Sequence, residues 1–456
     1  MISELINKAL YTLTVTSFML FGRLVNAEVL QVDAAKVVNL TLKDNKSLLL
    51  KFHKVNQAKL NLNAQRAKFL PTLNLQMLLP VYGQSHFLLS SVSILFPFLL
   101  PSQWFLVEKE KNLFEADVIS YSILQHNLIS NALSVYYTIL NDSNALNLLK
   151  MSLDNAEKNY QGLKRQNDIF DNVDENSLSQ ALVSVNLART KWYHLNELIK
   201  IELLTLRQLL GLELGVEIQL VHKDDSLNLE QLKNTYLNKN VQYLKELAWS
   251  KSLERKQLGY LLEASKKSKW AQVFNFFNSA LISSSRSTQA TNLESQLKGG
   301  LGINLGLDQL ISIQISDNEV DKIKIQEDIL KVEIDKTVNQ LIISGQSLHD
   351  QLALNEQNVM LQSKLLKSLQ LQYDIGFVDI EKVLEAQNTY YDFLTLSQKS
   401  RQEFILWKIS LERMFLSGPF EKISDCQRNE NLWKKDSFMD LFKKKKVSMD
   451  HYLKCI

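Results

Sequence analysis

Cysteine is scarce in this sequence, and this scarcity limits the chemistry that the chain offers. Cys426 and Cys455 are the only two, and both lie near the C-terminus. The sequence is equally compatible with a disulfide between them and with two free thiols. A signal peptide that ends at residue 27, as predicted below, would leave Glu28 as the first mature residue, and no cysteine lies near it to accept a lipid. No cysteine pair has the spacing of a zinc site. The seven histidines are scattered, and neither a metalloprotease pair nor a strained nucleophile turn occurs. We therefore predict no enzyme, no cofactor and no metal site.

Proline is absent from a very long part of the chain. Because proline breaks helices, a stretch without it permits very long ones. Four of the five prolines come early and one comes late: Pro71, Pro80, Pro97, Pro101 and Pro419.

Net charge and long apolar runs are also lacking. The 52 basic residues nearly balance the 49 acidic ones, so bulk charge gives no argument for a nucleic-acid partner. After the first residues, no run of about 20 apolar residues indicates a membrane-spanning helix. At the start, Lys8, the apolar run 9–21 and the small residues before Glu28 resemble an export signal. We expect a signal peptide over 1–27, with an amphipathic or buried first helix as the alternative.

The chain contains two similar halves. The segment 166–190 aligns with 372–395, and the segment from Lys68 aligns with that from Lys269, at an offset of about 200 in both cases. We therefore divide the chain into a signal peptide, a first repeat, an equatorial linker, a second repeat and a basic tail that we expect to be poorly ordered. The boundaries are 1–27, 28–215, 216–240, 241–417 and 418–456.

Each half carries a coiled-coil pattern, in which apolar residues recur every three and four positions. This spacing predicts a helix from about 103 to 167 that turns back near Asp171 and Asn172, and a second long helix that turns back at Gly376. The positions that recur with this spacing are Leu128, Ala132, Val135, Ile139, Asp142, Leu146, Leu149, Leu153, Ala156, Tyr160 and Leu163, then Leu348, Leu352, Asn355, Val359, Gln362, Leu366, Leu369 and Tyr373.

Shorter segments between the helices alternate with period two, which is typical of strands. Such a pattern suits a half-buried soluble strand or a transmembrane barrel strand. Four strands cannot close a barrel, for which about eight is the minimum, whereas three copies of the chain supply twelve. The segments are 72–77, 91–96, 274–276 and the glycine-rich 300–307.

The glycines of "KGGLGINLGL" invite comparison with a phosphate-binding loop, but their positions contradict it. Such a loop follows a strand and opens a helix, whereas these glycines lie inside the alternation. We predict that the apolar members face lipid and the small members face a lumen. The lipid-facing set is Leu301, Ile303, Leu305 and Leu307.

The motifs "AQRAKFLPTLNLQ", "SVSILFPFL", "LGINLGL" and "YDIGFVDIEKVLEAQNTYYDF" occur in an order that resembles the TolC-like outer membrane efflux proteins. The resemblance covers about 30–417 in both halves. It implies a mainly helical fold of long coiled-coil hairpins, with four strands per chain in a shared twelve-stranded barrel of a homotrimer. It also implies an outer-membrane location, with most of the chain in the periplasm, a periplasmic adaptor protein, and an inner-membrane pump or ABC exporter as partners.

The resemblance further assigns roles at the second turn. Lys382 and Glu385 occupy positions where the family has two acidic residues that line the narrow entrance. A surface ion pair between these two residues is the alternative.

The turns of both hairpins are also expected to contact the adaptor. These residues are Ile375, Gly376, Phe377, Val378 and Asp379, with Asp171, Asn172 and Val173 in the first half. The alternative at Asp379 is simple N-capping of the next helix.

The predicted function is that of a passive exit duct for efflux or type I secretion, gated at its periplasmic helix ends. The alternative is an exported coiled-coil structural protein without a pore. The sequence offers no selective pocket from which a cargo can be read.

Overall fold

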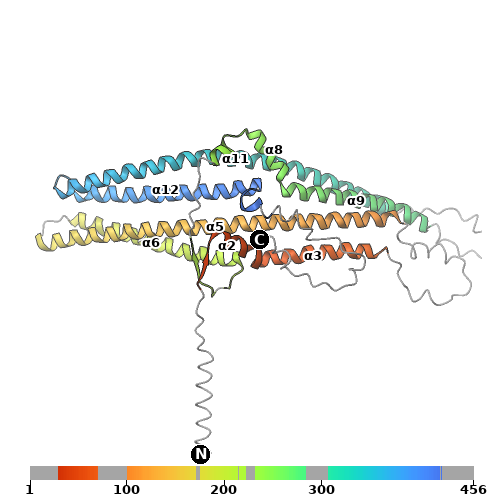
Figure 1. Ribbon diagram of the computed structural model, residues 1–456, viewed down its shortest axis with the longest axis horizontal. Coiled ribbons are helices and arrows are strands. Elements are labelled where there is room, and N and C mark those ends of the chain that lie inside the picture. Colours follow the sequence, from red (N-terminus) through yellow and green to blue (C-terminus); the bar gives the residue numbers. More distant parts are fainter. Residues whose placement is uncertain are drawn as a thin grey trace, which may run out of the picture.

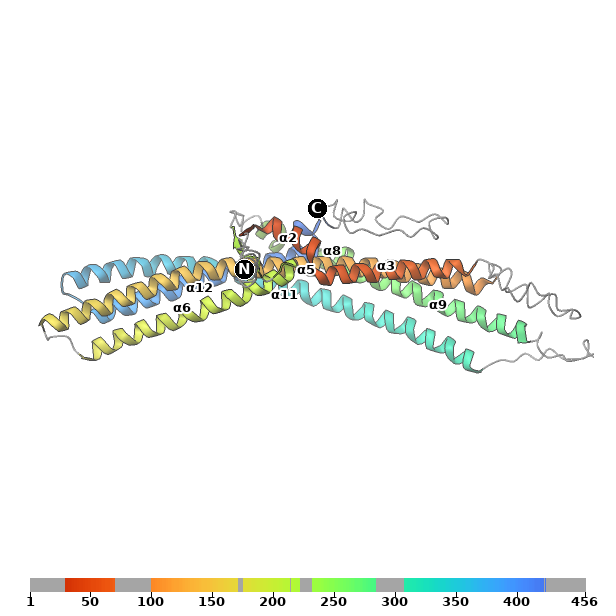
Figure 2. The ribbon, with the colours of Figure 1, turned by 90° about the horizontal axis from the view of Figure 1, so that it is seen from below.

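The computed structural model describes residues 29–69, 100–170, 175–213, 215–221, 232–283, 307–421 and 423. These residues form an elongated body whose helices run nearly parallel to its long axis (Figures 1 and 2). The body has two arms that meet at a waist, where the shorter elements gather.

Two helices run through the waist and link the two arms. Helix α5 spans Pro101–Phe170 and has 70 residues, and α11 spans Leu307–Asp374 and has 68. At 1.5 Å per residue each is about 100 Å long. The absence of proline from the interior of both helices permits this length. The predicted first long helix, from about 103 to 167, is confirmed.

The remaining long helices pack against these two in a repeated order. In the first half α3 (Lys46–Ala67) precedes α5, and α6 (Glu175–Leu210) follows it. In the second half α9 (Leu253–Ser283) precedes α11, and α12 (Ile380–Phe415) follows it. One arm therefore contains the hairpins α5–α6 and α11–α12, and the other contains α3, α9 and the first parts of α5 and α11 (Figure 2).

The waist is held together by contacts between segments distant in sequence. Strand β1 (Leu30–Val32) pairs in parallel with β2 (Ile218–Leu220). Asn45, between α2 (Ala34–Asp44) and α3, caps α3 and donates from Nδ2 to the Leu209 carbonyl at 2.8 Å. A core that includes Val37, Phe52, Tyr136 and Leu206 is nearly closed to solvent. On the opposite side lie the π-helical turn η3 (Lys233–Leu237) and α8 (Val241–Lys251).

The structure corrects three details of the sequence prediction. Phe274 and Phe276, predicted on a strand, lie within α9. Leu307, predicted on a lipid-facing strand, is the first residue of α11. Phe420, placed in the tail, is fully buried and stacks on His126 with ring centroids 5.9 Å apart, so the first tail residues belong to the helical body. The other predicted strand residues, Leu301, Ile303 and Leu305 among them, lie outside the described residues.

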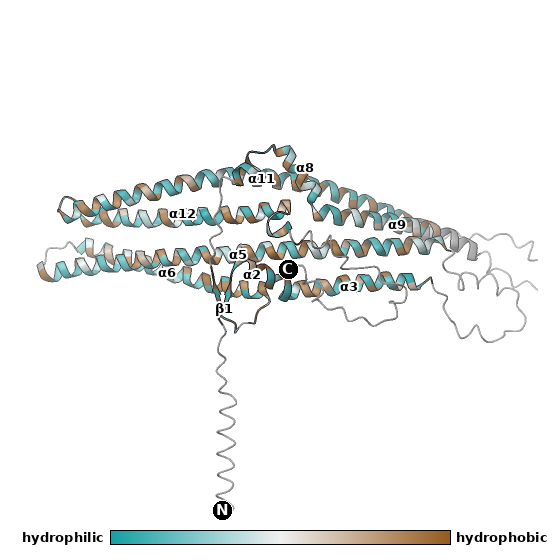
Figure 3. Cartoon of the chain, in the orientation of Figure 1, coloured by the Kyte–Doolittle hydropathy of each residue, from teal (hydrophilic) through white to brown (hydrophobic). Residues whose placement is uncertain are grey.

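Apolar and polar residues are interleaved along the long helices, as Figure 3 shows. None of the described helices combines the length and the apolar character needed to cross a membrane. Several large apolar side chains of α6 and α11 nevertheless lie exposed. They are Leu182, Val183, Leu187, Tyr193, Leu198, Ile201 and Leu204 on α6, and Ile311, Ile315, Ile325, Ile329, Val332, Ile343, Leu354, Met360, Leu361, Leu365 and Leu371 on α11.

Candidate functional site

The turn of the second hairpin places apolar side chains in solvent at the tip of the body. Gly376 has φ 77°, a left-handed conformation that glycine adopts without strain. Its N–H donates to the Tyr373 carbonyl at 2.9 Å, and that of Phe377 donates to the Gln372 carbonyl at 2.8 Å, which closes the end of α11. Ile375 and Phe377 are 67% and 81% exposed. The predicted apolar corner is therefore present.

Asp379 occupies the N-cap position of α12 but makes no side-chain capping bond. Simple capping therefore does not explain this carboxylate, which stays exposed beside the half-buried Val378. The turn residues of the first hairpin, Asp171, Asn172 and Val173, lie outside the described part of the chain.

Lys382 and Glu385 both lie exposed on the first turns of α12. They are three positions apart, so they lie on one side of the helix. Among the ion pairs of the described residues none joins them. The alternative of a surface ion pair is thus not what the structure contains.

A ladder of uncharged polar side chains joins the two hairpins along α5 and α12. Asn155 Nδ2 donates to Tyr391 Oη at 2.6 Å, and Asn159 Nδ2 donates to Gln387 Oε1 at 3.0 Å. Nearer the waist, Asn141 Nδ2 donates to Gln402 Oε1 at 2.9 Å. The amide nitrogen of Gln402 in turn donates to Thr138 Oγ1 at 3.0 Å. These bonds form what we call the hairpin seam. Each contributes about 0.5–1.5 kcal/mol net.

The interior of the first hairpin is apolar, unlike the seam. Leu153 and Ala156 of α5 pack on Val185 and Ala188 of α6, and all four are buried. Burial of these apolar side chains stabilises the contact between α5 and α6 by more free energy than single polar hydrogen bonds contribute. The first hairpin is therefore better suited to move as a unit than to come apart.

An acidic pair lies where the first hairpin meets the seam. Burial, together with the nearby Asp142 of α5, raises the pKa of Glu202 on α6 to about 7. Burial also raises the pKa of Asp142, although a hydrogen bond from Asn141 at 3.3 Å opposes this. Glu202 Oε2 is shielded from solvent without a hydrogen-bond partner. The pair is thus connected through Asn141 to Gln402 across the seam.

We predict that Glu202→Gln stabilises the protein only at neutral and basic pH. The folded-state pKa of Glu202 lies above its usual 4.5, so the folded protein binds this proton more tightly than the unfolded chain does. The burial of Glu202 therefore costs no stability at a pH below about 4.5, where the carboxyl is protonated in both states. Stability is lost as the pH rises from there through about 7. Because the side chain is only partly buried, solvent screening reduces the effect to about 1 kcal/mol. Thermal melts followed by circular dichroism between pH 4 and 8.5 measure it.

The matched control is Glu197→Gln, on the exposed side of α6. We expect it to leave the pH profile unchanged. Equal stabilisation by Glu202→Gln at pH 4 and pH 8 would show that the effect comes from packing rather than from the carboxylate charge.

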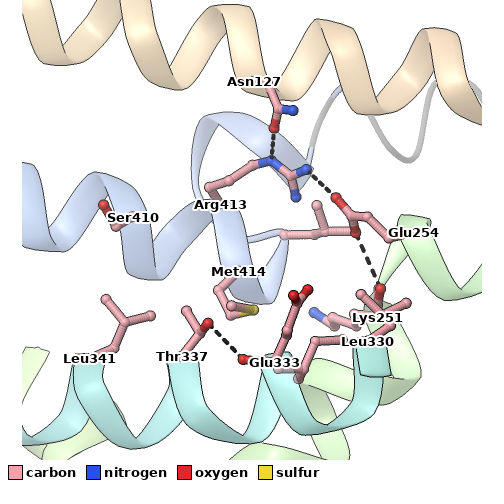
Figure 4. Close-up of a pocket in the computed structure, with 13 residues that line it drawn as sticks. Asn127, Lys251, Glu254, Leu330, Glu333, Thr337, Leu341, Ser410, Arg413 and Met414 are labelled. Carbon is pink, nitrogen blue, oxygen red and sulfur yellow. Dashed lines mark hydrogen bonds and ion pairs between the residues drawn. The ribbon is translucent and has the colours of Figure 1, made fainter. Parts of the chain in front are cut away.

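Arg413 near the end of α12 ties the second hairpin to both halves at the waist (Figure 4). Its Nε donates to Asn127 Oδ1 of α5 at 3.1 Å, and its Nη2 donates to Glu254 Oε1 of α9 at 2.8 Å. Burial opposes the ionisation of Glu254, but Arg413 and the other hydrogen bonds outweigh it and hold its pKa below the usual value. The three residues line a pocket of about 490 Å³. The waist is thus anchored by a charged hydrogen bond, whereas the seam between α5 and α12 is held by neutral ones.

Within the described residues, no group of three or more metal-binding side chains gathers at one place. The side chains at the tip and seam are amides, hydroxyls, apolar groups and single charges. This arrangement suits contact between helices.

Structural comparison finds similar solved proteins over most of the chain. The CmeC outer membrane channel of Campylobacter jejuni has a TM-score of 0.64 at 14% identity, with 87% of this chain and 89% of that chain covered. A membrane protein from Pseudomonas aeruginosa gives 0.65 at 14%, with 85% and 91% covered. The chain has the fold of outer-membrane channels. VceC of Vibrio cholerae, an outer membrane protein, gives 0.62 at 12%, with 84% and 95% covered.

No family model matches the sequence, and neither does any curated protein. The resemblance to TolC-like proteins is therefore confirmed at the level of the fold, through structure rather than sequence. Sequence analysis found the turn at Gly376 and both repeats but missed the seam. The signal for the seam was present as asparagine and glutamine within otherwise apolar heptads, as at Asn141, Asn155 and Gln402.

Proposed function

We propose that the chain is an exit duct of the outer membrane that serves efflux or type I secretion and performs no covalent chemistry. The observation that carries this is the fold, shared over 84–87% of the chain with proteins that include outer membrane channels. It is supported by the period-two segments between α3 and α5 and between α9 and α11, which place strand-like sequence at one end of the body.

The uncovered apolar side chains of α6 and α11 support assembly with further copies. An isolated coiled-coil rod buries its apolar residues between its own helices, whereas here apolar residues also lie on the outer face of α6. We propose that α6 of one copy packs beside the second hairpin of the next. With the four strands per chain that the resemblance to TolC-like proteins implies, three copies would supply twelve, enough for a closed barrel.

Gating is proposed to occur by movement of the second hairpin against the first. Apolar interiors keep each hairpin intact. The two hairpins are joined by a few neutral hydrogen bonds between α5 and α12 and by one exposed ion pair, Lys191–Asp392 at 3.5 Å. The Arg413 anchor at the waist serves as the pivot. Rigid elements with two discrete arrangements are the usual basis of such switching.

Electrical conductance after reconstitution into planar lipid bilayers tests the proposal. We expect discrete steps from detergent-extracted protein with three times the mass of one chain. A monomeric protein that fractionates as soluble and gives no conductance would support the alternative, a coiled-coil structural protein without a pore.

We predict that Lys382→Asp makes the open duct more selective for cations. The proposal places a ring of Lys382 beside a ring of Glu385 at the entrance, so the two fields oppose each other. Replacing the lysine leaves two negative rings, and the ratio of cation to anion permeability is expected to rise about threefold or more. The reversal potential under a salt gradient measures this ratio.

The control for Lys382→Asp is Lys367→Asp, an exposed position on α11. It makes the same charge change about two turns before the tip. An equal shift for both variants would mean that general surface charge, not an entrance ring, sets the selectivity.

The exposed tip is proposed to dock the periplasmic adaptor, and the export pump lies beyond it. The contact set is Ile375, Gly376, Phe377, Val378 and Asp379, with Asp171, Asn172 and Val173 from the first hairpin. Phe377→Ser is expected to abolish export in the native host but to leave conductance in bilayers unchanged. Loss of both would place Phe377 in the channel itself.

A further inference from the structure

The pocket beside Arg413, which we call the waist pocket, combines apolar side chains with four charged ones (Figure 4). Leu330, Ile334 and Leu341 line it from one face of α11, since they are four and then seven positions apart. Met414 and Leu416 at the end of α12 complete the apolar part. The volume of about 490 Å³ lies within the range of roughly 300–1,000 Å³ that is typical of small-molecule sites.

Two of the four charged side chains satisfy each other. Arg413 Nη2 donates to Glu254 Oε1 at 2.8 Å, and Ser252 Oγ donates to Glu254 Oε2 at 3.2 Å. Asn127 is also occupied, because its Oδ1 accepts from Arg413 Nε at 3.1 Å. This network fixes one edge of the pocket, and its two charges cancel.

The other two charged side chains, Lys251 and Glu333, have no such partner. Among the ion pairs of the described residues, none includes either of them. Both charged ends are directed into the pocket in Figure 4. The nearby Thr337 hydroxyl donates to the Glu333 carbonyl at 2.7 Å, so its proton is used within α11. The pocket therefore presents one ammonium and one carboxylate to a ligand.

A ligand that complements this lining carries both charges and an apolar body. Its carboxylate would accept from the Lys251 ammonium and its own ammonium would donate to Glu333, and charge-assisted bonds of this kind are stronger than neutral ones. A purely anionic or purely cationic compound would satisfy one side chain and repel the other. Apolar groups gain free energy by burial against Leu330 and Ile334. We propose that the waist pocket binds zwitterions with an aliphatic side chain, namely amino acids or short peptides.

Such a ligand would bridge three helices beside the Arg413 contact. Lys251 is the last residue of α8, Glu333 belongs to α11 and Met414 to α12. All of the lining comes from one chain. Binding therefore depends neither on assembly nor on the proposed exit duct, and failure of either leaves this inference standing.

Isothermal titration calorimetry of the full chain in detergent, near neutral pH, tests the proposal with L-leucine and L-leucyl-L-leucine. We expect at least one of these two probes to bind with a Kd below about 1 mM. The N-acetylated form of the bound probe lacks the ammonium, and its amide form lacks the carboxylate. Each form is expected to bind about tenfold more weakly, because one charge-assisted hydrogen bond is lost.

Variants assign each charge to its side chain. Glu333→Gln is expected to weaken the zwitterion about tenfold but to leave the N-acetylated form unaffected, since that form has no ammonium. Lys251→Met is expected to weaken the zwitterion but not the amide. The matched control is Glu319→Gln, an exposed position on α11 about 20 Å along the helix from Glu333. It is expected to leave all affinities unchanged.

Two kinds of result overturn the proposal. The first is the absence of binding by both probes at millimolar concentration. The second is binding that does not distinguish the zwitterion from its two blocked forms, or Glu333→Gln from Glu319→Gln. Apolar contact alone, with the pocket or with the detergent, would then explain the heat of binding.

Discussion

Alanine substitution of Asn155 and Asn159 is expected to open the proposed duct. Each asparagine donates one hydrogen bond across the seam to α12, to Tyr391 and Gln387. Such bonds contribute about 1 kcal/mol each, so the double variant loses about 2 kcal/mol of closed-state stability per chain. That loss corresponds to a roughly 30-fold shift toward the open arrangement. Mean conductance at low voltage in planar bilayers measures the shift.

The same helix offers a matched control. Asn144 and Asn147 lie exposed on α5 and form no bond across the seam. Their double alanine variant is expected to conduct as the wild type does. If both double variants raise conductance equally, a general softening of α5 explains the effect, and the seam does not hold the duct closed.

The distribution of polar bonds explains why opening is expected at the tip rather than at the waist. The waist has the charged Arg413 contact with Glu254 and a large apolar core. Toward the tip, α5 and α12 are joined by neutral bonds. The ion pair Lys191–Asp392 between α6 and α12 is exposed there and contributes little. A force on the exposed turn at Phe377 acts at the far end of this seam. Adaptor docking and opening would then be coupled through the rigid second hairpin.

Features that depend on local periodicity could be predicted from the sequence. The length of α5 follows from the heptad pattern and the missing prolines, and the turn at Gly376 follows from a residue that tolerates positive φ. The strand predicted at Phe274–Phe276 was wrong because three alternating residues are too few to distinguish a strand from the end of a helix.

Features that depend on contacts between distant segments could not be predicted. The pairing of Asn155 with Tyr391 joins positions far apart in the sequence, and no local pattern indicates which asparagine meets which partner. The burial of Phe420 against His126 is another such contact, since the two residues lie far apart in the sequence and Phe420 lies beyond the segment that the resemblance covers.

Assembly is expected to fail when charge is placed on the outer face of α6. Val183 and Ile201 are 65% and 53% exposed and lie about five turns of 3.6 residues apart, so they share one face. Burial of each against a neighbouring copy contributes about 2 kcal/mol. Val183→Asp with Ile201→Asp is therefore expected to weaken assembly at least roughly 1000-fold. The result is a folded monomer without conductance, as measured by light scattering in detergent and by circular dichroism.

A charge on a polar position of the first hairpin separates this effect from a general one. Asn144→Asp with Asn147→Asp introduces the same charge on exposed sites of α5 and is expected to leave both assembly and conductance intact. Because Val183 and Ile201 are exposed in the single chain, their replacement does not disturb the interior of the hairpin, where Val185 and Ala188 are buried. Helical content is thus expected to stay unchanged while assembly is lost. A double variant that remained trimeric would show that this apolar face of α6 does not lie between copies, and closure of the duct would then have to come from other surfaces.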